Sequence, residues 1–365
     1  MNILVDVGHP AHVHFYKNFI KEMEKKGHKL IVTEREKECT KDLLKYYGIK
    51  YLPLVGHIGI SYALLPKFLI NILRTQKLYY LMRQHNIEFG LGVSDYPVAW
   101  AGKLNNCKSI IFTDSEPVTI DKYFTYPFSN VIITPQYFSK KINLEKHIRV
   151  RSFKELAYLH PNWFKPNPNI YKILNISKNE KYVILRFNAF GAGHDIKIKG
   201  FSLSDKRTLV KKLKKYTHVF ISSELPLPND LELYRLNIPA HKMHDILYYA
   251  NLLICDTQTS TTEAACLGTP VIRSNKWVGP KDMSNFIELE QEYGLIYSIE
   301  QPKKAVEKGL ELIQNPDIKK EWQIKRKKFL QDKIDLTSFM VWFVENYPES
   351  NQIIVENPGY QKRFK

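Results

Sequence analysis

Residues 251–273 read NLLICDTQTSTTEAACLGTPVIR. The apolar run from Leu252 to Cys255 predicts a buried strand, and the hydroxyl-rich residues after it predict a loop that leads into a short helix. Gly268 and Pro270 then end the helix before a second short strand. A strand end followed by a helix N-terminus is where open α/β sheets bind ligands. The stretch therefore predicts an α/β fold with a ligand site at one edge of its sheet.

Four consecutive hydroxyl side chains, Thr259, Ser260, Thr261 and Thr262, precede Glu263. In a ligand site, the unpaired backbone N–H groups of Thr261 and Thr262 would point at an anion, with help from the helix dipole. Glu263, one turn into the helix, could accept hydrogen bonds from a ribose diol. The alternative is structural, since the hydroxyls could cap the helix and Glu263 could be its capping-box acid. The four hydroxyls in one run favour the ligand site.

This stretch resembles the donor-nucleotide motif of GT-B glycosyltransferases, and equally that of the related UDP-N-acetylglucosamine 2-epimerases. The resemblance rests on the hydroxyl-rich loop, Glu263, Gly268 and Pro270. In both families the loop binds the diphosphate and the Glu binds the uridine ribose. The resemblance therefore implies a UDP-sugar substrate and an α/β fold of the GT-B type, with two Rossmann-like, doubly wound parallel-sheet domains facing a cleft.

Composition sets broad limits on the partners of the chain. With 365 residues, of which 44% are hydrophobic, it is long enough and apolar enough for two cores. The net charge of +17 indicates anionic partners, and nucleic acid is not expected because no nucleic-acid-binding motif accompanies the charge. The 4 cysteines form no C-x-x-C pair, which favours a reduced, cytoplasmic chain without a zinc site.

The order of the predicted elements indicates two similar halves. Alternating strands and helices over the first 150 residues predict a parallel, doubly wound sheet, and a second such series follows a Pro- and Asn-rich stretch. We expect residues 1–165 to form a Rossmann-like acceptor domain and residues 166–335 a Rossmann-like nucleotide-sugar domain. Residues 336–365 should form a helix and tail that cross back to the first domain. The oligomeric state is not determined by the sequence.

Residues 58–83 predict a helix that is apolar over much of its circumference and has a basic edge. One interpretation is a core helix of the first domain. The other is an interfacial helix that holds the protein on an anionic membrane surface, which would suit a lipid-linked acceptor. No uncharged apolar run reaches the roughly 20 residues of a membrane span. We therefore expect a cytoplasmic protein, either soluble or peripheral on the inner face of the membrane.

The loop after the first predicted strand contains Gly8, His9, His12 and His14. Gly8 allows a ligand to approach the backbone closely, and histidine exchanges protons near neutral pH. The spacing of the histidines does not match a helical metal site, so no metal is expected. The alternative role of each histidine is a helix cap or a core filler. The loop resembles that of the peptidoglycan N-acetylglucosaminyltransferase branch of GT-B, and on that comparison His12 is the favoured base.

Asp95 and Glu116 each follow a predicted strand, at the edge of the sheet where active sites form. They are candidate acid–base groups, and equally plausible helix caps. The segments around them resemble a pair of βα units in the 2-epimerases, in which the Asp and the Glu are catalytic. Those enzymes have a second Glu further along, whereas this chain has Asn130 there and Asp121 at a different spacing. That difference weakens the epimerase interpretation.

In the second half, Arg186, Asn188 and His194 follow a clear strand within a Gly-x-Gly context. An Arg fork suits a phosphate, and the matching loop in the resembled families contacts the donor diphosphate. Asn285 lies where sugar transferases contact the transferred sugar, and the resemblance extends that role to it.

As a whole, the chain resembles an archaeal and bacterial domain-of-unknown-function family of the DUF354 type with a GT-B-like fold, through the GHPAHVHF motif at residues 8–15. The leading hypothesis is a metal-independent glycosyltransferase for a glycan or lipid-linked acceptor, as in cell-envelope polysaccharide synthesis. The first alternative is a non-hydrolysing UDP-N-acetylglucosamine 2-epimerase. The second is a non-catalytic protein that binds a nucleotide sugar or a polyanion.

Overall fold

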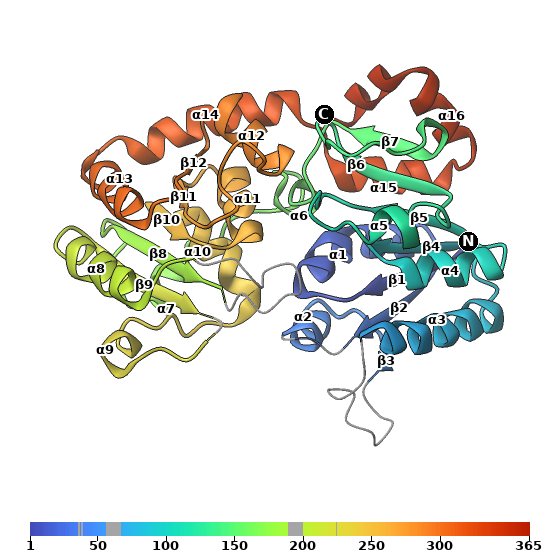
Figure 1. Cartoon of the computed structure of the whole chain (residues 1–365), viewed down its shortest axis with the longest axis horizontal. Helices are drawn as coiled ribbons and strands as arrows, with labels where there is room; N and C mark the ends of the chain where they lie inside the picture. Colours follow the sequence, from blue (N-terminus) through green and yellow to red (C-terminus); the bar gives the residue numbers. More distant parts are fainter. Residues whose placement is uncertain (36, 38, 56–66, 189–199, 224) are drawn as a thin grey trace. The chain divides into compact units, whose positions relative to one another are not determined.

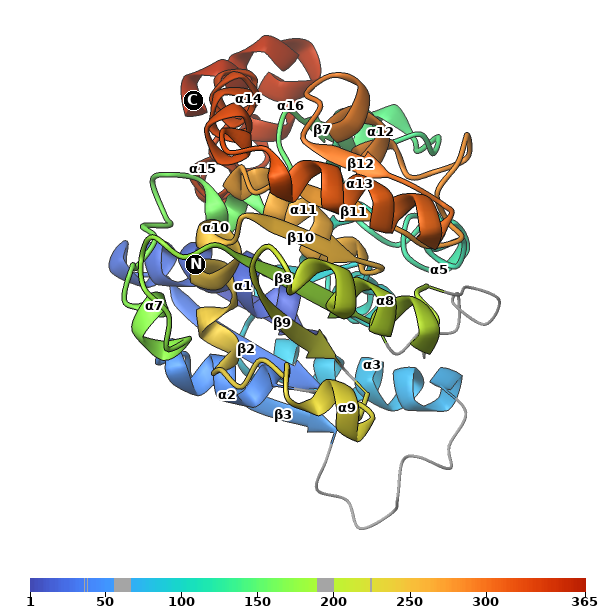
Figure 2. The same cartoon turned by 90° about the vertical axis from the view of Figure 1, so that its left-hand side faces the viewer.

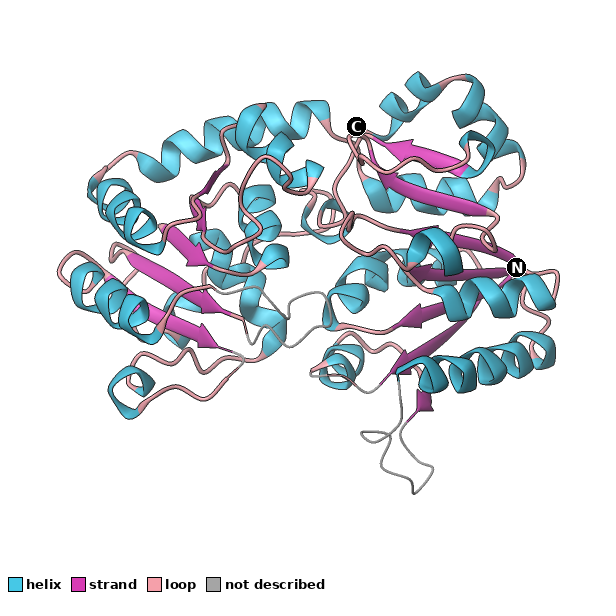
Figure 3. Ribbon diagram, viewed as in Figure 1, coloured by secondary structure: helices cyan, strands magenta, loops and turns pink. Residues whose placement is uncertain are grey.

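The computed structural model describes residues 1–35, 37, 39–55, 67–188, 200–223 and 225–365. The chain forms two compact units. The first unit comprises Met1–Tyr158 together with Lys333–Lys365, and the second comprises Leu159–Asp332. Each unit contains one parallel β-sheet with helices on its faces (Figures 1 and 3).

The sheet of the first unit has seven strands in the order β3-β2-β1-β4-β5-β6-β7. Its strands are β1 (Asn2–Val7), β2 (Lys29–Arg35), β3 (Leu52–Val55), β4 (Phe89–Val93), β5 (Lys108–Phe112), β6 (Val131–Pro135) and β7 (His147–Val150). Its helices are α1 (Pro10–Lys25), α2 (Thr40–Tyr46), α3 (Lys67–Gln84), α4 (Tyr96–Leu104), α5 (Asp121–Phe124), α6 (Leu156–Leu159), α15 (Leu336–Glu345) and α16 (Glu349–Glu356). The chain moves outward from β1 to β3 and then returns to the other side of β1 with β4. The switch point of this sheet therefore lies between β1 and β4, where such sheets bind ligands.

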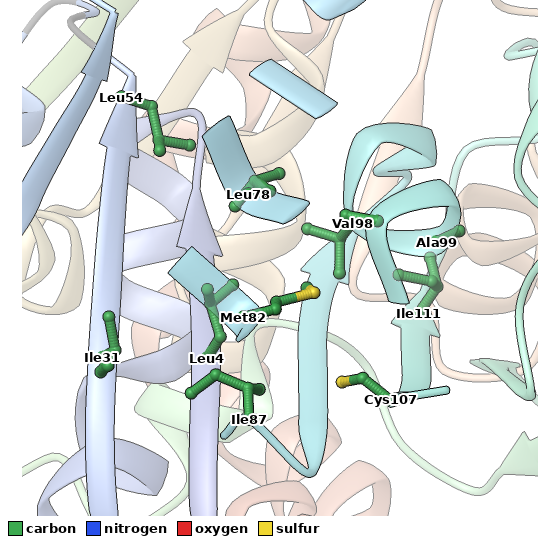
Figure 4. Close-up of a cluster of buried hydrophobic side chains, with 11 residues drawn as sticks. Leu4, Ile31, Leu54, Leu78, Met82, Ile87, Val98, Ala99, Cys107 and Ile111 are labelled. Carbon is green, nitrogen blue, oxygen red and sulfur yellow. The ribbon is translucent and has the colours of Figure 1, made fainter. Parts of the chain in front are cut away.

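The apolar core of the first unit includes a cluster between the sheet and helices α3 and α4 (Figure 4). Leu4 of β1 faces Leu78 and Met82 of α3 and Val98 of α4 in this cluster. Because side chains alternate along a strand, Asp6 lies on the same face of β1 as Leu4. An acidic side chain is thus directed from the sheet toward α3.

The predicted helix over residues 58–83 corresponds to α3, which begins at Lys67; residues 56–66 lie outside the described part of the chain. The second half of α3 is a core element, as Leu78 and Met82 show. Near its N-terminus, Phe68, Leu69 and Ile72 are 52%, 44% and 39% exposed. Among the described residues, no helix has the length and hydropathy needed to cross a membrane.

The C-terminal segment is fixed to the first unit by buried hydrogen bonds as well as by packing. The Ser152 hydroxyl donates to the Ile334 carbonyl at 2.8 Å. The Thr337 hydroxyl of α15 donates to the Ala157 carbonyl at 2.7 Å, and α15 packs against α1. The last 33 residues therefore complete the fold of a unit that begins at Met1.

The second unit has a five-stranded sheet in the order β12-β11-β10-β8-β9. Its strands are β8 (Tyr182–Phe187), β9 (His218–Ser223), β10 (Leu252–Cys255), β11 (Val271–Arg273) and β12 (Ile296–Ser298). Its helices are α7 (Ile170–Ile173), α8 (Leu203–Leu213), α9 (Asn229–Glu232), α10 (Met243–Tyr249), α11 (Gln258–Leu267), α12 (Ser284–Gln291), α13 (Pro302–Gln314) and α14 (Ile318–Asp332). Helix α13 packs on the sheet (Figure 2). The close approach occurs at Gly309, where an added Cβ would lie 2.7 Å from Ile254. The switch point lies between β8 and β10.

Candidate functional site

At the switch point of the first unit, Gly8 lies against a guanidinium group. Nη2 of Arg35, the last residue of β2, donates to the Gly8 carbonyl at 3.3 Å. A Cβ at residue 8 would lie 2.8 Å from that nitrogen. Gly8 therefore allows the close approach of Arg35 to the loop, whereas the approach of a ligand there stays a prediction.

The hydrogen bonds of His9 and His12 give these two histidines different roles. His9 is the N-cap of α1, and its Nδ1 accepts the Ala11 N–H at 3.1 Å. Nδ1 of His12 accepts the Gly8 N–H at 3.3 Å, which places the proton of the neutral ring on Nε2. Burial lowers the pKa of His12 well below its ordinary value, and nearby cationic groups, including Lys154, lower it further. The geometry thus favours His12 as a hydrogen-bond donor, in place of the base that the sequence favours.

Asp95 lies at the same switch point, directly after β4. It is 7% exposed and is the N-cap of α4, where its Oδ1 accepts the Val98 N–H at 3.3 Å. Its Oδ2 accepts from Nη2 of Arg74 at 3.2 Å. Burial raises the pKa of Asp95 to about 7; Arg74 opposes that rise, whereas the neighbouring Asp6 adds to it. Asp95 therefore has both the structural role and the proton affinity that the sequence left as alternatives.

Asp6 is a member of this group that the sequence analysis missed. It is fully buried in β1, its Oδ1 accepts from the Thr33 hydroxyl at 2.6 Å, and its Oδ2 accepts from Arg74. Burial favours the protonated form, but Arg74, Asp95 and Thr33 outweigh it, and the pKa of Asp6 is lowered. An acidic residue inside an otherwise apolar strand is the sequence signal that could have identified it.

Backbone strain occurs beside the same group. Ser94, between β4 and Asp95, has a φ of 47°, in the left-handed region that non-glycine residues rarely adopt. Its hydroxyl donates to Thr113 Oγ1 at 2.9 Å. Such outliers concentrate at functional sites, where the surrounding structure stabilises them.

Glu116 follows the next strand, β5, at the same edge of the sheet, since Val93 pairs with Phe112. It is 7% exposed, and its Oε1 accepts the Ser139 N–H at 3.3 Å. Nearby, Lys154 donates to Asp114 at 2.6 Å. The structure therefore brings Asp95 and Glu116 to one sheet edge and gives each a hydrogen-bonded position.

In the second unit, the hydroxyl-rich residues are part of a helix and not of a loop. Helix α11 begins at Gln258, with Thr257 as its N-cap, so Thr259 and Ser260 lie in its first turn. The N–H groups without helical partners are those of this first turn, and not those of Thr261 and Thr262 as the sequence predicted. The hydroxyls of these two residues donate to carbonyls of their own helix, Thr261 to Thr257 at 2.7 Å and Thr262 to Thr259 at 2.9 Å. The N-terminus of α11 therefore presents Gln258, Thr259 and Ser260.

Glu263 lies in the second turn of α11 and is 6% exposed. Its Oε1 lies 2.9 Å from Nε2 of His244 in α10, which is itself buried. The ring of His244 packs edge-on against Phe164. The carboxylate is thus held in one orientation by a neighbouring helix, which the sequence did not show.

Across the switch point of the second unit, Arg186, Cys255 and Arg273 pair in register at the carboxyl ends of β8, β10 and β11. Nη1 of Arg186 donates to the Ser222 hydroxyl at 2.6 Å. The Asn188 N–H donates to Oδ1 of Asp256 at 2.7 Å. The structure therefore places Arg186 and Asn188 at the end of the strand next to β10, which leads into α11, with the Arg186 guanidinium hydrogen-bonded to β9.

Two further predicted residues of the second unit are His194 and Asn285. His194 lies outside the described residues. Asn285 is buried at the start of α12, where its Oδ1 accepts the N–H of Phe286 at 2.9 Å. Arg273 forms an ion pair with Asp282 and lies over the Phe286 ring, 3.7 Å from its centre. Asn285 therefore stabilises the first turn of its own helix.

Asp256, between β10 and α11, is a second acid that the sequence analysis did not single out. It is 2% exposed, and burial raises its pKa to about 7. The hydrogen bond from the Asn188 N–H and the positive charge of Lys206 oppose that rise. Gly200 lies so close that a Cβ there would clash with Oδ2 of Asp256. Asp256 thus links β10 to the chain segments that follow β8.

Within the described ranges, no group of three or more His, Cys, Asp or Glu side chains is placed to hold a metal ion.

Comparisons with solved structures give the fold. The UDP-GlcNAc 2-epimerase from Neisseria meningitidis bound to UDP-GlcNAc is 14% identical, with a TM-score of 0.65 over 95% of this chain and 100% of that one. The Streptomyces sp. SF2575 glycosyltransferase SsfS6 is 11% identical, with a TM-score of 0.61 over 95% and 100%. The glycosyltransferase VinC in complex with dTDP is 13% identical, with a TM-score of 0.61 over 96% and 100%.

With their two parallel sheets, the units of this chain have the GT-B fold that the sequence predicted. Among curated proteins the sequence has no match. A family model described as "Protein of unknown function (DUF354)" matches residues 1–348. The chain therefore belongs to the DUF354 family.

Proposed function

We propose that this protein is a glycosyltransferase that moves a sugar from a UDP-sugar to a hydroxyl group of a glycan or lipid-linked acceptor. The observation that carries the proposal is the arrangement at the β8–β10 switch point. There, Arg186 and the first turn of α11 occupy neighbouring strand ends. A guanidinium fork and a helix N-terminus are both suited to a phosphate.

In this proposal the second unit binds the nucleotide. The diphosphate contacts Arg186 and the N–H groups of Gln258, Thr259 and Ser260, and the ribose diol contacts Glu263, which His244 orients. These groups also stabilise the negative charge that develops on the leaving diphosphate, so the mechanism is metal-independent. The solved structures with UDP-GlcNAc and dTDP support a nucleotide sugar as the substrate class.

The first unit then supplies the acceptor site and the base. A pKa near 7 suits Asp95 to take a proton from an acceptor hydroxyl, because a base is most effective when its pKa is close to the working pH. His12, with its proton on Nε2, donates a hydrogen bond to an oxygen of the substrate. Arg35 places positive charge beside the same loop.

A UDP-N-acetylglucosamine 2-epimerase is the second candidate. One observation favours it: Asp95 and Glu116 follow neighbouring strands at one sheet edge, where two carboxyl groups could exchange the proton at C2. This reaction requires no acceptor.

One experiment separates these candidates. The purified chain is incubated with UDP-N-acetylglucosamine in D₂O and followed by NMR, without and with a panel of acceptor glycans. A new glycosidic signal and free UDP only in the presence of an acceptor support the transferase. Inversion at C2 with deuterium uptake supports the epimerase instead. Binding of UDP without either reaction would leave a non-catalytic nucleotide-sugar protein.

A further inference from the structure

We propose that Asp6 is a positioning residue for Asp95, and that these two carboxyl groups, bridged by Arg74, hold one proton between them. The inference rests on the proposed function only in its last step, where Asp95 acts as the proton-transfer group. The Asp6–Arg74–Asp95 group consists of residues from β1, α3 and the β4–α4 junction, three elements that meet at the switch point.

The first argument is the geometry of the bridge. A single nitrogen, Nη2 of Arg74, donates to Oδ2 of both Asp6 and Asp95, at 3.2 Å in the case of Asp95. All three residues are buried: Asp6 is 0% exposed, Arg74 3% and Asp95 7%. One guanidinium cannot neutralise two buried carboxylates, and an excess buried charge is costly. Retention of one proton makes the three hydrogen-bonded residues neutral. Arg35 also favours both ionised forms, but its guanidinium is hydrogen-bonded to the Gly8 carbonyl.

The second argument concerns which carboxyl group keeps the proton. Asp6 accepts from Arg74 and also accepts from the Thr33 hydroxyl at 2.6 Å. Asp95 has longer contacts, 3.2 Å from Arg74 and 3.3 Å from the Val98 N–H. Shorter hydrogen bonds to a carboxylate favour its ionised form. In agreement, the pKa of Asp6 is lowered and that of Asp95 is raised.

The remaining groups around Asp95 come from the other packed elements. Arg35 at the end of β2 favours the ionised form of Asp95. Tyr16 of α1 and Tyr96 of α4 have pKa values raised by burial, so both phenols remain neutral. Arg35 also contacts the Gly8 loop. A charge change on Asp95 is therefore felt by a residue that lies beside the candidate site.

This arrangement explains why Asp95 can act near neutral pH. An aspartate at a helix N-cap ordinarily becomes more acidic, because the cap N–H groups and the helix dipole favour the carboxylate. Burial of Asp95 and, after it, the fixed negative charge of Asp6 counteract that effect. In the proposed transfer Asp95 acts in its ionised form, which is populated as the pH reaches and passes its pKa of about 7. The acceptor O–H bond breaks and its proton moves to the Asp95 carboxylate. The acceptor oxygen bonds to C1 of the sugar, and the C1–oxygen bond to the diphosphate breaks, so UDP leaves with that electron pair.

The test is a carboxyl-carbon NMR titration of the full chain with ¹³C-labelled aspartate, with Asp95→Asn used to assign the signal. In the wild type, Asp95 should titrate near neutrality while Asp6 stays ionised. Asp6→Asn removes the charge but keeps the size of the side chain, and should lower the Asp95 midpoint by about one pH unit or more. Asp42→Asn, an exposed acid on α2, should leave the midpoint unchanged.

Two results would overturn the inference. One is an Asp95 signal that is already ionised at pH 5 in the wild type, a measurement that does not depend on any variant folding. The other is an Asp95 midpoint that Asp6→Asn leaves in place. Neither readout needs a substrate, so failure of the proposed function would not affect them. Where turnover is found, Asp6→Asn should also shift the acidic limb of the kcat profile to lower pH, which a purely structural residue would not do.

Discussion

Nε2 of His244 lies 2.9 Å from Oε1 of Glu263, and both side chains are buried in the second unit. This contact connects α10 to α11 and fixes the acidic side chain to which the proposed function assigns the ribose. A carboxylate oriented in this way has already lost the side-chain freedom that binding would otherwise cost. The contact therefore suits a binding role for Glu263, and it can be tested directly.

Glu263→Gln should weaken UDP binding by about 10- to 100-fold, the cost of about 1.4–3 kcal/mol for losing a charged hydrogen-bond acceptor. Isothermal titration calorimetry measures this. His244→Phe should weaken binding less, because the carboxylate remains but is no longer held. The control is Glu311→Gln, an exposed side chain on α13, which makes the same chemical change away from the site. Equal UDP affinity in the wild type and Glu263→Gln would remove the ribose role.

Arg186→Lys should weaken binding of UDP about tenfold and leave uridine binding unchanged, since a lysine keeps the charge but cannot form a bidentate contact with a phosphate. The comparison of the two ligands by calorimetry isolates the phosphate contribution. Arg207→Lys, at an exposed ion pair with Asp230, serves as the matched control. A parallel loss of uridine affinity would show that Arg186 acts through the fold and not through the phosphates.

Asp256→Asn should alter how stability depends on pH. Because burial raises the pKa of Asp256 to about 7, the folded state keeps a proton that the unfolded chain loses above about pH 4. The stability that the proton on folded Asp256 contributes is complete below the pKa of Asp256 in the unfolded chain. It is lost as the pH rises to about 7, at up to about 1.4 kcal/mol per pH unit. Urea denaturation at several pH values should therefore show Asp256→Asn gaining stability relative to the wild type between pH 4 and 7.

The exposed Asp230 gives the opposite control for this measurement. Its hydrogen bond with Arg207 lowers its pKa, so Asp230→Asn should show no gain relative to the wild type as the pH rises. If both variants follow the wild-type curve in parallel, Asp256 is ionised in the folded protein and the assignment of its proton is wrong.

Gly8→Ala should lower turnover while changing the melting temperature little. The added Cβ would meet Nη2 of Arg35, the far end of a flexible side chain that can move away. The loop then loses the guanidinium beside it. Initial rates with a UDP-sugar and an accepted glycan, together with a thermal melt, measure both effects. Gly48→Ala, at a φ of 67° and with no heavy atom near its Cβ, is the contrasting variant: it should cost stability and not rate.

Much of the fold could be predicted because it depends on local patterns. The strand at residues 3–7, the helix after it and the strand ending near Thr33 are confirmed as β1, α1 and β2, since apolar runs and a Gly-terminated helix specify them locally. The short strand β7 was missed, because four residues with one exposed side chain carry little periodic signal.

The chemistry of the site could be predicted only in part. Asp95 stands next to a recognisable strand end and Glu263 lies in the helix that follows one, whereas the role of Asp6 is visible only when Arg74, which is distant in the sequence, reaches it. The tautomer of His12 likewise depends on the Gly8 N–H, which no sequence pattern displays. Proton affinities follow burial and neighbours, and these exist only in the folded chain.

The return of Lys333–Lys365 to the first unit has a consequence for synthesis. Because the second unit is one continuous insertion, it can reach its native state while the ribosome is still translating. The first unit must wait for α15, which follows the whole second unit in the chain and packs against α1. The first unit therefore completes its fold only after the second unit has been synthesised.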